Sequence, residues 1–202
     1  LFLREYFPEL VIEAPVQERL DRRQQHRQAI ADVRAEAIDI KATINQNENE
    51  IENIEVPRLN PDNPLYWYQM IGVRHALCIG NSANFSVPGS GKTWMAYATY
   101  FIMNDEQHDV DRLLVIGPKV AYRAWRREYR AMTNQDPNIV QIAGRPNERQ
   151  NIFNDDNKEI YFINYAMLSR ELDAVIRMLQ RHNFLVIADE SHHFKNHRSG
   201  VA

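Results

Sequence analysis

The most constraining feature of the chain is a short glycine-containing segment, Ser86-Val87-Pro88-Gly89-Ser90-Gly91-Lys92-Thr93. It joins an apolar segment that we expect to form a strand, Ala83–Val87, to one that we expect to form a helix, Lys92–Met103. Glycines let backbone N–H groups turn towards a phosphate, and the following helix adds the positive end of its dipole. The segment therefore predicts a phosphate-binding loop between a strand and a helix.

Each polar residue of this loop has an expected role. Lys92 would neutralise the β- and γ-phosphates of ATP, and Thr93 would ligate magnesium. Ser86 stands where such loops usually carry Gly or Ala. ATP and magnesium are the expected cofactors, and the residues expected to contact ATP along the loop are Pro88, Gly89, Ser90, Gly91, Lys92 and Thr93.

A pair of acidic residues, Asp189 and Glu190, directly follows the apolar segment Phe184–Ala188. In open parallel sheets, ligands bind at the carboxyl ends of the strands. We expect Asp189 to hold the magnesium ion and Glu190 to orient and polarise the attacking water. Lys92, Asp189 and Glu190 are thus the candidate catalytic residues, and Thr93 and Asp189 the candidate metal ligands.

Short apolar segments alternate with longer helical ones from residue 65 onwards, which predicts an α/β fold with a mostly parallel sheet covered by helices. The expected helices are Tyr66–Cys78, Lys92–Met103, Ala121–Met132 and a segment from about residue 165 to Arg181. The expected strands are Ala83–Val87, Leu113–Ile116, Ile139–Ala143, Ile160–Ile163 and Phe184–Ala188.

The first 60 residues differ in character from the rest, because they contain no glycine and carry apolar residues at helical spacing. We expect residues 1–60 to form a helical N-terminal arm or hairpin, and residues 61–202 to form a separate α/β domain that contains the phosphate loop. Pro57–Pro64, with three prolines, is the expected linker. The arm either packs on the main domain or binds a protein partner, and the sequence leaves both open.

The composition excludes several classes of protein. Cys78 is the only cysteine, so the chain has no internal disulfide and no cysteine-based zinc site, and an intracellular protein of the cytoplasm, nucleoid or nucleus is expected. No apolar run approaches the length of a membrane-spanning helix, so no membrane partner is expected. The net charge of −3 gives no overall basicity of the kind that marks nucleic-acid binding.

Several segments, in order, resemble the first RecA-like lobe of Swi/Snf-type ATPases of helicase superfamily two. Asp189-Glu190-Ser191-His192, with Lys195-Asn196 after it, resembles the DEAH box of that family. Upstream, Tyr68-Gln69 with Gly72-Val73 resembles the family's segment before the phosphate loop. Motif Ia is resembled by Gly117-Pro118-Lys119 with Trp125 and Glu128, and motif Ib by Asn164-Tyr165 with Leu168. The resemblance covers about residues 65–198.

The resemblance implies further site residues. Gln69 would read adenine, and His192 would couple nucleotide hydrolysis to movement. Lys119, Arg123 and Asn164 would contact the phosphodiester backbone of DNA. The resemblance to the Swi/Snf group implies that this DNA is a duplex. The arginines of the expected helix 121–132 share one face. That face either contacts nucleic acid or is an ordinary solvated surface whose arginines pair with nearby acids.

The resemblance also implies a partner for this lobe. A second RecA-like lobe, which carries arginine fingers in that family, would close over the nucleotide. By the resemblance, residues 61–202 would form a partial first RecA-like lobe, from the phosphate loop to the DEAH-like box, without the second lobe. We therefore expect negligible ATP hydrolysis by this chain alone.

The leading interpretation is the ATP-binding motor lobe of a double-stranded DNA translocase. A strand-separating DNA or RNA helicase of superfamily two shares the same lobe and stays open. A P-loop adaptor ATPase that binds protein partners is a third reading. Zinc binding by His192, His193 and His197 is a weaker alternative, because Asp189 is assigned to magnesium.

Overall fold

The computed structural model describes residues 54–191. Its centre is a sheet of four parallel strands in the order β2-β3-β1-β4. The strands are β1 (Arg112–Ile116), β2 (Ile139–Gln141), β3 (Ile160–Ile163) and β4 (Phe184–Ala188). This confirms the predicted α/β fold with a parallel sheet, whereas residues 1–53, most of the predicted N-terminal arm, lie outside the described residues.

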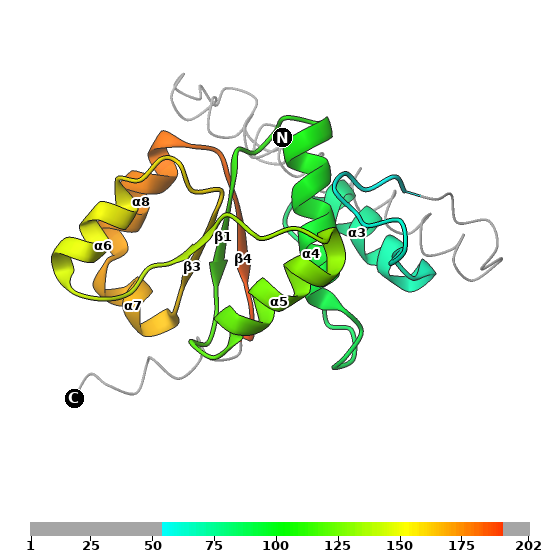
Figure 1. Cartoon of the computed structure of the whole chain (residues 1–202), viewed down its shortest axis with the longest axis horizontal. Helices are drawn as coiled ribbons and strands as arrows, with labels where there is room; N and C mark the ends of the chain where they lie inside the picture. The colour runs from blue at the N-terminus through cyan, green and yellow to red at the C-terminus, as the bar shows by residue number, and fades with distance from the viewer. Residues whose placement is uncertain (1–53, 192–202) are drawn as a thin grey trace, which may run out of the picture.

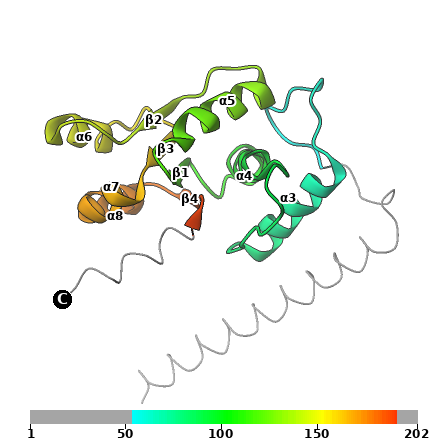
Figure 2. The same ribbon diagram turned by 90° about the horizontal axis from the view of Figure 1, so that it is seen from below.

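Helices cover both faces of the sheet (Figures 1 and 2). One face carries α3, α4 and α5, and the other carries α6, α7 and α8. Their bounds are α3 (Trp67–Ile79), α4 (Lys92–Phe101) with a π-helical turn η1 (Ile102–Glu106), α5 (Ala121–Thr133), α6 (Pro146–Phe153), α7 (Tyr165–Arg170) and α8 (Leu172–Arg181).

Alternation along the buried strands divides the core into two parts. In β1, Leu113 and Val115 pack with α3, α4 and α5, while Leu114 and Ile116 pack on the opposite face with α6 and α8. All four side chains are buried because successive residues of a strand point to opposite faces. A continuous apolar segment is therefore what a strand covered on both faces requires.

The predicted strand Ala83–Val87 is wrong. These residues are exposed and belong to no strand, and the side chain of Phe85 is 92% exposed. A strand needs a neighbour to satisfy its backbone, and among residues 54–191 β4 pairs with β1 alone. Instead, Asn84 Oδ1 accepts hydrogen bonds from the backbone N–H and the hydroxyl of Ser86, at 3.0 and 2.6 Å. Local polar contacts of this kind favour a turn over a strand.

Other differences are smaller. The helix predicted to run to Arg181 is two helices that meet at Glu171, and the predicted strand Ile139–Ala143 ends at Gln141. Helix α6 was not expected from the sequence. It begins with Pro146 in its first turn, and the Glu148 carboxylate accepts a hydrogen bond from the backbone N–H of Arg145 at 2.6 Å. Both features are helix-start signals.

The linker is anchored to the lobe through Arg58. Its guanidinium donates to both carboxylate oxygens of Asp105, at 2.6 and 2.5 Å, and also to Glu159, and it lies 5.0 Å from the centre of the Phe101 ring. Although burial alone would lower it, hydrogen bonds to Asp105 and Glu159 raise the pKa of Arg58 above its usual value. This cluster ties three separate parts of the chain together.

We expect Arg58→Ala to lower the free energy of unfolding by about 2–3 kcal/mol, because it leaves Asp105 and Glu159 partly buried without their cation. Urea unfolding followed by circular dichroism measures the change. Arg130→Ala is the matched control, since the Arg130–Asp136 pair is exposed and should be worth less than about 1 kcal/mol. Equal losses for the two variants would contradict this role of Arg58.

Candidate nucleotide site

The phosphate loop leads directly into α4, as the sequence predicts. Gly89 and Gly91 have φ angles of 82° and 79°, a left-handed conformation that glycine adopts without steric cost. A Cβ at Gly91 would also lie 2.1 Å from Nε2 of Gln69, so a side chain does not fit there. The loop therefore depends on glycine at position 91 for both conformation and space.

Lys92 is the first residue of α4, and its side chain folds back across the loop. Its Nζ donates to the backbone carbonyls of Ser86 and Val87, at 2.5 and 3.0 Å. The side chain is exposed, and these carbonyls are neutral acceptors. A phosphate is a stronger acceptor for an ammonium group than a carbonyl, so this lysine can exchange its partners for an anion.

Gln69 lies beneath the loop and is buried. Its Nε2 donates to the carbonyl of Ser90 at 3.2 Å, and its Oε1 accepts from the backbone N–H of Tyr66 at 2.9 Å. Both ends of the amide thus have partners, and the side chain connects the start of α3 to the phosphate loop. The role of Gln69 in reading adenine stays a prediction.

The acidic pair lies at the carboxyl end of β4. In register, Ile116 of β1 pairs with Ala188 of β4 and with Ile163 of β3. The residues that follow the three strands, Gly117, Asn164 and Asp189, therefore come to one edge of the sheet. Asp189 accepts a hydrogen bond at Oδ2 from Nε1 of Trp125, at 2.9 Å.

The backbone of the acidic pair has two further features. The backbone carbonyl of Asp189 accepts a hydrogen bond from the hydroxyl of Tyr165. Burial, with the charges of Asp189 and Glu190, raises the pKa of Tyr165, so this phenol stays a donor at neutral pH. Glu190 is exposed and has a φ of 55°, an uncommon conformation for a residue other than glycine.

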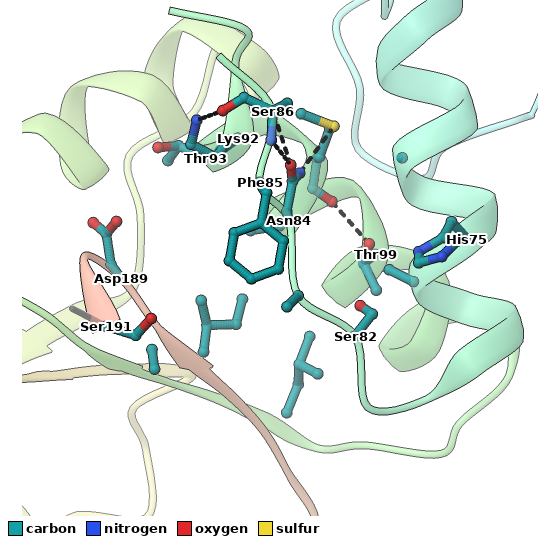
Figure 3. A pocket seen from close by; sticks show the side chains of 18 of the residues that line it. His75, Ser82, Asn84, Phe85, Ser86, Lys92, Thr93, Thr99, Asp189 and Ser191 are labelled. Carbon is teal, nitrogen blue, oxygen red and sulfur yellow. Dashed lines mark hydrogen bonds between the residues drawn. The ribbon is translucent and has the colours of Figure 1, made fainter. Parts of the chain in front are cut away.

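One cavity of about 1610 Å³ collects these residues (Figure 3). Figure 3 shows Lys92 and Thr93 on one side of it and Asp189 across from them. Glu190, Trp125 and Ser86 line it as well. The structure thus brings Lys92 and Thr93 together with Asp189 and Glu190, although these residues are up to 98 positions apart in sequence.

The donors in this cavity suit a magnesium-bound nucleotide. A hydroxyl from Thr93 and a carboxylate from Asp189 are hard oxygen ligands, which magnesium prefers together with phosphate oxygens and water. Lys92 and the N-terminus of α4 carry positive charge of the kind that favours bound phosphate. Within residues 54–191, no group of three His, Cys, Asp or Glu side chains could hold a metal by itself. His192, His193 and His197 lie outside the described residues.

Of the candidate nucleic-acid residues, Lys119 lies between β1 and α5, Arg123 lies on α5, and Asn164 directly follows β3. Lys119 and Arg123 are exposed. Asn164 instead caps α7, since its Oδ1 accepts from the backbone N–H of Met167 at 2.9 Å. On α5, two of the arginines pair with nearby acids, Arg127 with Glu128 and Arg130 with Asp136. Contact of Lys119, Arg123 and Asn164 with nucleic acid stays a prediction.

The fold has a counterpart of known structure. The chain is similar to the Sulfolobus solfataricus SWI2/SNF2 ATPase core in complex with double-stranded DNA, with a TM-score of 0.54 and 18% sequence identity. The match covers 73% of this chain and 30% of that one. This chain therefore spans less than a third of its structural neighbour. A comparison with curated proteins gave no match. None of the helices in residues 54–191 is long and apolar enough to cross a membrane.

The family follows from a sequence model rather than from the fold. The model for the type III restriction enzyme res subunit matches residues 85–200, which is more than half of the chain. That range begins just before the phosphate loop and extends past the acidic pair. The chain belongs to this family, and its fold is that of a RecA-like lobe of helicase superfamily two.

Proposed function

We propose that the chain is the ATP-binding motor lobe of a double-stranded DNA translocase. The observation that carries the proposal is that the phosphate loop and the acidic pair line one cavity. The structural neighbour, which was solved with double-stranded DNA, supports duplex DNA as the partner. A second RecA-like lobe would complete the site, as the resemblance implies.

The roles of the residues follow from their chemistry. Magnesium, when bound with the nucleotide, supplies positive charge to the β- and γ-phosphate oxygens. Thr93 and Asp189 would hold it, and Lys92 would turn from the carbonyls of Ser86 and Val87 to the phosphates. Glu190 would orient the attacking water and accept its proton. Exposed Lys119 and Arg123 would contact the DNA backbone, which sets affinity and register but carries no sequence information.

The test of the proposal is the nucleic-acid dependence of ATP hydrolysis. The assay uses a protein in which this lobe is accompanied by a second one. Duplex DNA should stimulate turnover more than single-stranded DNA or RNA does. Stimulation by single strands alone would favour the strand-separating helicase, and turnover indifferent to nucleic acid would favour the adaptor ATPase.

We expect Lys92→Ala to weaken the binding of magnesium-ATP by roughly 10–100-fold, because it removes a charge-assisted contact with phosphate that is worth about 1.5–3 kcal/mol. Titration of a fluorescent ATP analogue into the chain measures the affinity. Lys119→Ala is the control, since it removes an exposed lysine that does not line the cavity. Wild-type affinity in Lys92→Ala would contradict the phosphate-loop assignment.

We expect Glu190→Gln to bind magnesium-ATP normally and to hydrolyse it about 10²–10⁴-fold more slowly, because a proton acceptor for water is lost. Asp189→Asn should weaken the magnesium dependence of binding as well. Binding and single-turnover hydrolysis are measured separately for both variants, in a protein in which a second lobe accompanies this one. Normal hydrolysis by Glu190→Gln would show that the general base lies elsewhere.

A further inference from the structure

The side chain of Trp125 has one polar atom, and that atom contacts the carboxylate of Asp189. Its indole Nε1 donates to Oδ2 at 2.9 Å, and the residue is only 3% exposed. A buried indole N–H that lacks an acceptor is unfavourable, so this contact stabilises the position of both groups. A phenylalanine could fill an apolar site of this kind, but it could not hold the carboxylate.

The indole is itself held in place by α4. The ring of Tyr97 packs edge-on against it, with ring centres 5.1 Å apart and planes at 72°. The hydroxyl of Tyr97 also donates to the backbone carbonyl of Trp125 at 3.0 Å. Because α4 is the helix that begins at Lys92, the indole has a fixed position relative to the phosphate loop.

The backbone of Asp189 is equally well fixed. Its N–H donates to the carbonyl of Ile116 at 2.7 Å, and its carbonyl accepts from Tyr165. Gly117 packs closely beside it, since a Cβ there would lie 3.2 Å from the Cβ of Asp189. The backbone contacts leave the carboxylate of Asp189 free to rotate. Trp125 limits this rotation, because its Nε1 donates a hydrogen bond to Oδ2.

We propose that Trp125 is a positioning residue, which orients the Asp189 carboxylate for a divalent cation through its indole N–H. The proposal rests on the proposed function, because Asp189 must be the magnesium ligand. A donor that fixes one carboxylate oxygen leaves the other to the metal, and it limits rotation of the group. Outer-shell partners of this kind commonly change metal affinity by about 10–100-fold.

The chain supplies a matched control for this contact. Trp94 donates from its Nε1 to Oε2 of Glu128, also at 2.9 Å, and neither residue lines the cavity. Trp94→Phe therefore removes the same kind of hydrogen bond from a neighbouring place. A general effect of losing an indole would appear in both variants, whereas a positioning effect would appear in Trp125→Phe alone.

The experiment titrates magnesium into the chain with a fluorescent ATP analogue present and measures nucleotide affinity. In Trp125→Phe, the magnesium concentration at half-maximal effect should rise by about 10-fold or more, while affinity in EDTA stays unchanged. Trp94→Phe should match the wild-type chain in both conditions. Loss of affinity in EDTA as well would mean that Trp125 acts only by packing, and it would overturn the proposal.

A second measurement needs no change at Trp125. The chain has three tryptophans, so the double variant Trp67→Phe, Trp94→Phe leaves Trp125 as the sole tryptophan, whose emission is excited selectively over that of tyrosine. Its fluorescence should change when magnesium is added to the ADP-bound chain, and Asp189→Asn should abolish that change. This readout decides the matter if Trp125→Phe does not fold.

The outcomes separate this inference from the proposed function. Suppose that the wild-type chain binds magnesium-nucleotide. If Trp125→Phe then shows the magnesium dependence of the wild type, and the emission of the sole-tryptophan chain does not change with magnesium, only the positioning role fails. If the wild-type chain binds no nucleotide with or without magnesium, the proposed function fails, and this inference fails with it.

Discussion

The in-register parallel pairing of β1 with β3 and β4 is the constraint on which the site depends. Ile116 pairs with Ile163 on one side and with Ala188 on the other, so all three strands end at the same level. Parallel strands need helical crossovers, and those helices bury both faces of the sheet. Because the helices cover both faces, polar residues can gather at the edge where the strands end, and Asp189 lies there.

Much of this arrangement could be predicted from local sequence. The apolar segments of β1, β3 and β4 are continuous because both faces are buried, and Asp189 follows the last of them. Gly89 and Gly91 mark the loop because the backbone there is left-handed. The strands and the loop depend on residues that are close together in sequence, so the order of residue types along the chain is enough to predict them.

What the sequence did not reveal depends on distant partners. Ala83–Val87 has the composition of a strand, but no strand lies beside it among the described residues, so Asn84 and Ser86 form local contacts instead. The hydrogen bond between Trp125 and Asp189 joins residues 64 positions apart, so no local pattern could predict it. The Arg58 cluster likewise joins residues up to 101 positions apart.

In the proposed function, the Ser86–Thr93 loop and Asp189 bind one magnesium-nucleotide between them. A crystal structure of the chain with magnesium and ADP tests it most directly. We expect the β-phosphate in the loop, Lys92 Nζ moved from the carbonyls of Ser86 and Val87 to a phosphate oxygen, and the metal between Thr93 and the Asp189 carboxylate. A nucleotide bound elsewhere, or one in the loop with Asp189 remote from its metal, would contradict the account.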